Sequence, residues 1–162
     1  MASTDDSSSL DLTRQMRQYG DTVLLGTRLQ TLGDQLTSLE LAQNAIGDAG
    51  LIGLLQVLRQ PGVGQRLRFL GLSRNSIGDR GAAALAEYLV DSAAQTLEHL
   101  ELRDNNVGDD GAVALASAIE RTQCLRHLSL FHNAVGQRGA RALAKALARN
   151  ATLQALDLRI NL

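Results

Sequence analysis

Leucines recur along the chain in a pattern typical of short strands that bury one side. The pattern is Leu-x-x-Leu-x-Leu-x-x-Asn, and five complete copies of it are present. The copies begin at Leu36, Leu67, Leu97, Leu125 and Leu153, which are 31, 30, 28 and 28 residues apart. Alternate side chains of a strand point to opposite faces, so the second and third Leu of each copy share one face. The spacing therefore predicts a repeated unit with one short strand in each copy.

A second pattern, between the strand copies, predicts a helix. Each of the first four strand copies is followed by a motif of the form Ile/Val-Gly-Asp-x-Gly, with Gln137 in the Asp place of the last motif. Apolar residues then recur at i, i+1 and i+4, which places them on one face of a helix. These apolar positions are Leu54, Leu55, Leu58, Leu85, Ala86, Leu89, Leu115, Ala116, Ile119, Leu143, Ala144 and Leu147.

The distance from strand to helix is constant, whereas the return to the next strand varies. The last strand Leu and the last helical apolar residue are 17 positions apart in every copy, as between Leu41 and Leu58. The next strand copy begins 9, 8, 6 and 6 positions after the helix. Variation confined to one type of loop is typical of a packed unit with tolerant connections at one rim. We therefore predict four full strand–helix repeats plus a final strand over residues 36–162.

A degenerate copy of the same unit precedes the first complete one. Leu10 and Leu12 occupy strand positions, and Leu25 and Leu29 occupy helical positions with the same 17-residue spacing. Terminal repeats of a solenoid are atypical because one of their faces meets water. We therefore predict a degenerate N-terminal capping repeat over residues 7–35 and a flexible tail over residues 1–6.

The repeats resemble the leucine-rich-repeat family, specifically its ribonuclease-inhibitor-like subfamily. The repeat domains of nucleotide-oligomerisation-type receptors and of Ran GTPase-activating protein are similar. The resemblance implies an α/β fold, a right-handed β-α solenoid or horseshoe segment with a parallel concave sheet and convex helices. It also implies that the Asn after each strand bonds to backbone groups of neighbouring turns. These residues are Asn44, Asn75, Asn105, Asn133 and Asn161.

The Asp of the helical motif is expected to be a helix cap. Asp48, Asp79 and Asp109 each stand where an N-cap side chain would accept hydrogen bonds from the first amides of the helix that follows. Gln137 is a poorer cap. Capping also explains why Asp79 and Asp109 recur, so we do not interpret the acidic residues as a metal cluster.

Composition and charge narrow the function classes. The formal net charge is −1 with cations and anions interspersed, so we expect neither nucleic acid nor a membrane as partner. The N-terminus has no apolar signal region, and the single Cys124 fits a reducing compartment, so a cytoplasmic location is expected. The sequence contains no phosphate-binding glycine loop, nucleophile elbow or paired metal cysteines. We therefore predict no enzymatic activity and no cofactor.

The strand positions that face away from the core would form the docking surface of such a solenoid. The predicted partner-binding residues on this concave face are Phe69, His99, Glu101, Arg103, Asp104, His127, Phe131, His132 and Arg159. Phe131 and Arg103 lead this set, because aromatic and Arg side chains are favoured anchors and the two occupy the same position of adjacent repeats. A zinc site from His99, His127 and Glu101 is conceivable, but no outer partner can be named for it, and no metal is predicted.

The sequence thus predicts a protein–protein interaction module that binds a partner protein through its concave sheet. Two alternatives stay open. A GTPase-activating protein similar to the Ran regulator would use the same repeat type, although the acidic tail of that family is missing and the repeats are fewer. A structural subunit of a larger assembly would fit the fifth strand copy, which no helix follows before Leu162. That uncapped C-terminal end predicts self-association or further repeats.

Overall fold

Short strands and helices alternate along the chain. The computed structural model describes residues 8–15 and 21–162, so the predicted tail over residues 1–6 lies outside the described residues. The strands are β1 (Ser9–Asp11), β2 (Ser38–Glu40), β3 (Phe69–Gly71), β4 (His99–Glu101), β5 (His127–Ser129) and β6 (Ala155–Asp157). The helices are α1 (Asp21–Leu32), α2 (Gly47–Leu58), α3 (Asp79–Leu89), α4 (Asp109–Ile119) and α5 (Gln137–Leu147). Two 3-10 helices, η1 (Gly33–Gln35) and η2 (Ser92–Ala94), lie in return segments.

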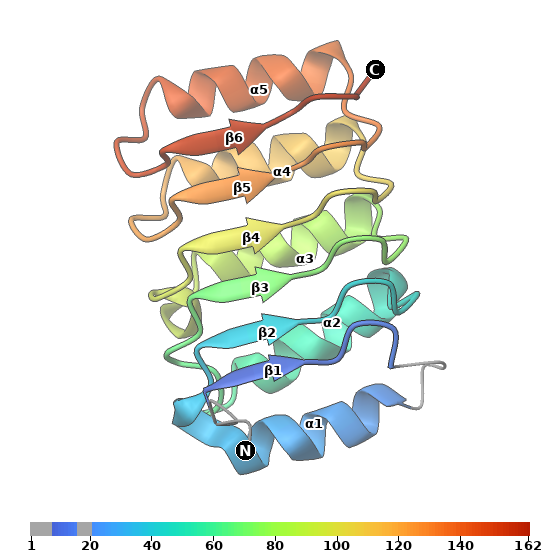
Figure 1. The fold of residues 1–162 in the computed structure, drawn as a ribbon. Helices are drawn as coiled ribbons and strands as arrows, with labels where there is room; N and C mark the ends of the chain where they lie inside the picture. The colour runs from blue at the N-terminus through green and yellow to red at the C-terminus, as the bar shows by residue number, and fades with distance from the viewer. Residues whose placement is uncertain (1–7, 16–20) are drawn as a thin grey trace, which may run out of the picture.

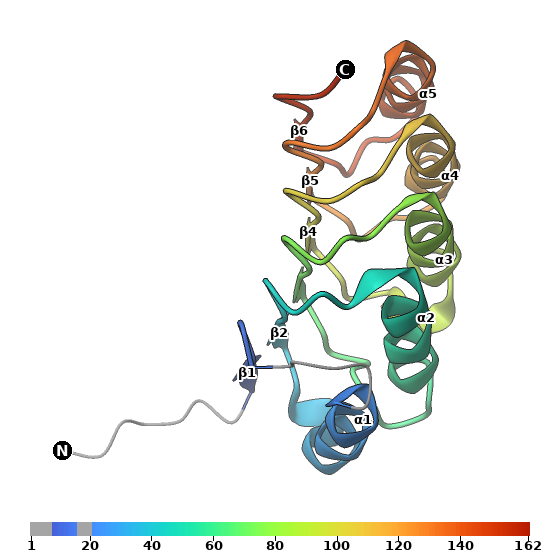
Figure 2. The ribbon, with the colours of Figure 1, turned by 90° about the vertical axis from the view of Figure 1, so that its right-hand side faces the viewer.

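The six strands form one parallel sheet in chain order, as the repeat predicts. Figure 1 shows the strands stacked from β1 to β6 with the helices behind them, and Figure 2 shows sheet and helices as two layers. Strands stack about 4.8 Å apart, whereas helices are about 10 Å wide, so the array must bend toward the strand side. The face of the sheet that no helix covers therefore lies on the inside of the curve.

The core lies between the two layers and consists mostly of leucine and alanine. Leu100, Leu102 and Leu115 have no exposed surface, and Ala112 of α4 has none either. Burying one Leu side chain stabilises a fold by roughly 1.5–3 kcal/mol, so the repeated leucines supply the main driving force.

The predicted inner face of α5 is wrong at two positions. Ala144 is exposed, and Leu147 keeps 37% of its surface exposed. The equivalent Ala116 and Ile119 of α4 are buried. In the described part of the chain α5 packs against a helix on one side only, so its far flank meets solvent.

The predicted asparagine ladder is confirmed. Asn105 donates from Nδ2 to the carbonyls of Leu72 and Leu102, both at 2.9 Å. Its Oδ1 accepts from the backbone amides of Asn75 and Ile77, both at 3.0 Å. One buried side chain thus bonds to four backbone groups from two repeats, and for all of them except the Leu102 carbonyl, which also accepts from Asn133, it is the side chain that keeps them paired in the interior.

The capping prediction for the motif aspartates is wrong in its direction. Asp79 is the first residue of α3, and its carboxylate bonds to the next helix: Oδ1 accepts from the amides of Gly108 at 2.7 Å and Gly111 at 2.9 Å. The equivalent sets are Asp48 with Gly78 and Gly81, and Asp109 with Gly136 and Gly139. A Cβ on Gly111 would lie 2.7 Å from that oxygen, so this approach requires glycine. The N-termini of α3, α4 and α5 are therefore each capped by the preceding repeat.

Candidate functional site

The uncovered face of the sheet presents four rows of side chains, each with one residue per repeat. Strand pairing aligns two rows: the first row (Ser9, Ser38, Phe69, His99, His127, Ala155) and the acidic row (Asp11, Glu40, Gly71, Glu101, Ser129, Asp157). Backbone hydrogen bonds align two more: the third row (Thr13, Ala42, Ser73, Arg103, Phe131, Arg159) and the turn row (Arg14, Gln43, Arg74, Asp104, His132, Ile160). All nine predicted partner-binding residues lie in these rows.

The aromatic ring of Phe131 lies between two guanidinium groups. The Arg103 guanidinium carbon is 5.0 Å from the ring centroid and that of Arg159 is 5.5 Å away. A cation at this distance from a ring face is attracted by its quadrupole, by roughly 0.5–1 kcal/mol at exposed sites. The ring is half-buried. Phe131 is therefore held in place from both neighbouring repeats.

Arg159 is in turn fixed by Asp157, two residues earlier on the same side of the chain. Arg159 donates from Nε to Oδ1 of Asp157 at 3.0 Å and from an Nη to Oδ2 at 2.7 Å. These bonds, with the backbone amide of Arg159, lower the pKa of Asp157 to about 2. Asp157 is thus ionised at neutral pH and acts as an acceptor rather than as a proton donor.

Asp104 holds the turn row together. Its carboxylate accepts from Arg74 Nε at 3.0 Å and lies 2.5 Å from Nδ1 of His132. The hydrogen bond with His132, and then that with Arg74, keep the pKa of Asp104 below its usual value. Backbone φ at Asp104 and His132 is 54° and 52°, a left-handed conformation that ordinary residues seldom adopt. The backbone adopts this left-handed conformation where the chain leaves the strand and turns toward Asn105 or Asn133 of the ladder.

His99 and His127 stack face to face in the first row. Their ring centroids are 4.3 Å apart and the planes differ by 3°. Ring-nitrogen lone pairs lie in the ring plane, so two parallel rings cannot both direct them at one ion about 2.0–2.1 Å away. The zinc site considered from the sequence therefore does not fit this geometry. Nδ1 of His127 is buried without a hydrogen-bond partner in the described part of the chain.

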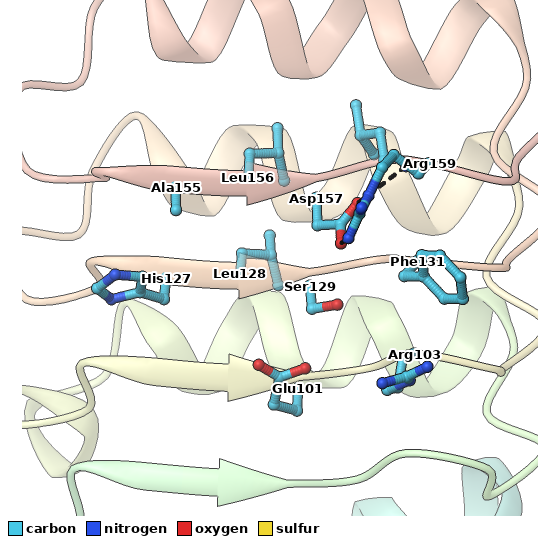
Figure 3. Close-up of a pocket in the computed structure, with 11 residues that line it drawn as sticks. Glu101, Arg103, His127, Leu128, Ser129, Phe131, Ala155, Leu156, Asp157 and Arg159 are labelled. Atoms are coloured by element: carbon cyan, nitrogen blue, oxygen red, sulfur yellow. Dashed lines mark hydrogen bonds and ion pairs between the residues drawn. The ribbon is translucent and has the colours of Figure 1, made fainter.

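A pocket of about 720 Å³ opens on the uncovered face over β4, β5 and β6 (Figure 3). Its lining residues are Glu101, Arg103, His127, Leu128, Ser129, Phe131, Ala155, Leu156, Asp157, Leu158 and Arg159. Figure 3 shows Arg103, Phe131 and Arg159 at one end of the pocket and His127 at the other, with Glu101, Ser129 and Asp157 between them. The pocket thus combines an aromatic and cationic end with a polar floor.

Comparison with known proteins explains the repeat. A family model described as Leucine Rich repeat matches residues 36–55, 66–86, 93–116 and 122–144. This chain belongs to the leucine-rich repeat family. A solved structure titled "Leiomodin-1 Actin-Binding Site 2 (ABS2)" has a similar fold, with a TM-score of 0.70 and 24% sequence identity over 82% of this chain and 75% of that one. The search of curated proteins gives no match.

The leucine-rich repeat register brings together five of the nine predicted residues. Glu101, Arg103, His127, Phe131 and Arg159 line the pocket. The other four, Phe69, His99, Asp104 and His132, lie in the same rows but outside that lining.

Sequence reasoning missed two polar residues of the pocket, Ser129 and Asp157. Both stand at the same strand position as Glu101, which the pairing register makes neighbours. That shared position was the signal that could have found them.

No helix in the described ranges is long and apolar enough to span a bilayer.

Proposed function

We propose that this leucine-rich repeat chain is a non-catalytic interaction module that binds a partner protein through the concave sheet face, with Phe131 as its anchor. The observation that carries the proposal is the ring of Phe131 held between Arg103 and Arg159 beside an open pocket. Anchors of protein interfaces are enriched in aromatic and Arg side chains. A ring that is already fixed loses little further freedom when a partner packs against it.

The chemistry of the pocket supports binding rather than catalysis. Asp157 is held by Arg159, and no described group bonds to Nδ1 of His127 to orient that ring as an acid or base. In the described part of the chain no hydrogen bond joins Ser129 to a histidine, which a serine nucleophile would need. We therefore propose contact with a protein surface rather than turnover of a substrate.

Actin is the first partner to test, because the similar solved structure is titled an actin-binding site. Co-sedimentation with filaments and native electrophoresis with monomers cover both forms of actin. In parallel, affinity capture is performed with the wild-type chain and with Phe131→Ala. Proteins that the wild type retains and Phe131→Ala does not are further candidate partners.

The decisive experiment is a titration of the identified partner by calorimetry. Truncating a well-packed anchor costs roughly 2 kcal/mol or more, so Phe131→Ala should weaken binding at least about 30-fold. The control is Arg141→Ala, an exposed change on the outer helix α5 that should be near neutral. Equal affinities of the two variants would show that the sheet is not the docking face.

We also propose that the repeats are of the ribonuclease-inhibitor-like type and that residues 7–35 cap the array.

We propose further that the β6 edge meets further repeats or a second copy. Leu153, Leu156 and Leu158 are only partly buried. The equivalent leucines of the β4 repeat, Leu97, Leu100 and Leu102, have at most 1% of their surface exposed. Self-association through this edge would raise the sedimentation coefficient measured by sedimentation velocity. A variant with Leu156→Lys should then sediment as the monomer.

A further inference from the structure

Three aromatic rings occupy consecutive places in the first row of the uncovered face. Phe69, His99 and His127 stand at the same strand position of β3, β4 and β5, and the pairing register aligns them. The rings of His99 and His127 are parallel, with centroids 4.3 Å apart. Parallel strands repeat about every 4.8 Å, so each strand supplies one place for a ring at nearly stacking distance from the last.

The next place in this row contains no ring. Ala155 of β6 pairs with His127, carries only a methyl group and is exposed. Because β4 and β6 lie on opposite sides of β5, the face of the His127 ring turned away from His99 is turned toward Ala155. In the described part of the chain no second ring stacks on that face. The row of rings is thus interrupted beside a ring face that is still open.

The pocket lies over this interruption. His127 and Ala155 both line it, and Figure 3 shows them at the end away from Phe131, with no other labelled side chain between them. Asp157, the nearest acid of β6, is held by Arg159 and does not fill the place. The volume of about 720 Å³ lies within the range of pockets that enclose small ligands, so a ring side chain fits.

The walls of the vacant place favour an aromatic occupant. They are the face of an imidazole ring and a methyl group, with Leu156 next along β6. A flat side chain can cover both walls at once, and offset-stacked rings gain more than their apolar area alone provides. Trp and Tyr are also enriched among the anchors that fill pockets at protein interfaces.

We propose that the partner protein inserts an aromatic side chain, Trp or Tyr, beside Ala155 and stacks it on His127 as the next ring of the row. This inference rests on the proposed function and adds the chemistry that the partner brings. His127 and Phe131 then mark the two ends of the contact, four residues or about 13 Å apart along β5. The stack on His99 holds the His127 ring in place before the partner arrives, so little freedom is lost on binding.

A direct test uses small probes in place of the partner. N-acetyltryptophanamide is titrated into isotope-labelled protein, and the ring protons of His127 and the methyl group of Ala155 are followed by NMR. The His127 protons should move upfield and saturate, because they lie over the plane of the stacked indole. N-acetylcyclohexylalaninamide, which is apolar but has no π-system, should bind at least about fivefold more weakly. N-acetylargininamide tests a flat cation at the same place.

Two variants at Ala155 separate filling of the place from loss of the fold. Ala155→Leu fills it and should weaken the tryptophan probe at least about tenfold, whereas the matched control Ala155→Gly leaves it open and should change the Kd less than about twofold. Ala155 is exposed, so neither change should alter the amide spectrum of the core. His127→Ala should weaken the probe about fivefold, and His132→Ala, an exposed histidine outside the pocket lining, should not.

Absence of saturable shifts, equal affinities of the tryptophan and cyclohexylalanine probes, tighter binding of the arginine probe, or full binding in Ala155→Leu would each overturn the inference. The same variants are then titrated with the natural partner. If Ala155→Leu leaves that affinity unchanged while Phe131→Ala lowers it, the proposed function stands and this inference falls. If neither variant affects the partner, the proposed function itself has failed.

Discussion

The carboxylate of Asp79 should stabilise α4 rather than its own helix. Asp79→Ala removes two hydrogen bonds that the amides of Gly108 and Gly111 donate to the Asp79 carboxylate. Loss of an N-cap side chain costs roughly 0.5–2 kcal/mol, and hydrogen bonds to charged groups lie at roughly 1.5–3 kcal/mol. Because both bonds are part-buried and one acceptor serves both, we expect a loss of about 2 kcal/mol, or about 4–8 °C in Tm for a domain of this size.

The assay combines urea unfolding with native-state hydrogen exchange. The amides of Gly108 and Gly111 should exchange about 30-fold faster in Asp79→Ala, which corresponds to the same 2 kcal/mol. Asp79→Asn, which keeps an acceptor oxygen, should lose less than half as much. The control is Asp110→Ala, an exposed carboxylate one residue into α4 that pairs with Arg138 and should cost under about 0.5 kcal/mol. Faster exchange at Gly81 in α3 instead of Gly111, or equal losses at Asp79 and Asp110, would refute capping across repeats.

Two further predictions concern the ladder and the pocket. Asn105→Ala should lower the free energy of unfolding by at least about 3 kcal/mol in urea titrations, because it leaves three buried backbone groups without their partner, while the Leu102 carbonyl keeps its bond from Asn133. Asn161→Ala at the half-buried last position should cost about 1 kcal/mol. The carboxyl carbon of Asp157 should titrate in NMR with a midpoint near 2, and Arg159→Gln should move the midpoint up toward about 3.9. A pKa lowered on folding stabilises the native state above the unfolded pKa, so this contribution should be present above about pH 4 and lost as pH falls toward 2; an unchanged midpoint in Arg159→Gln would contradict it.

The fold followed from the sequence because the pattern of leucines repeats with a fixed strand-to-helix distance. The same register put Arg103 beside Phe131, since equivalent positions of parallel strands are neighbours. The ladder of Asn105 was expected only through the family resemblance, and the structure confirms it.

Other features depend on geometry that a repeat pattern does not encode. The spacing of Asp79 fits a cap on its own helix and a cap on the next one equally well, and only the position of the neighbouring repeat decides between them. Side-chain rotation sets the stacking of His99 on His127. The pairing of Asp157 with Arg159 was within reach, because residues two apart on an extended chain share a face.

Capping by the preceding repeat gives the solenoid a direction. Each carboxylate serves amides that lie later in the chain, as Asp48 does for Gly78 and Asp109 for Gly136. During synthesis the acceptor thus leaves the ribosome before the helix that needs it, and every new turn meets a template already in place. Cutting the array behind a repeat leaves only a carboxylate that water solvates well. Losing the repeat before a helix removes the anionic cap of that helix. The array should therefore unfold more easily from its N-terminal repeats than from its C-terminal ones.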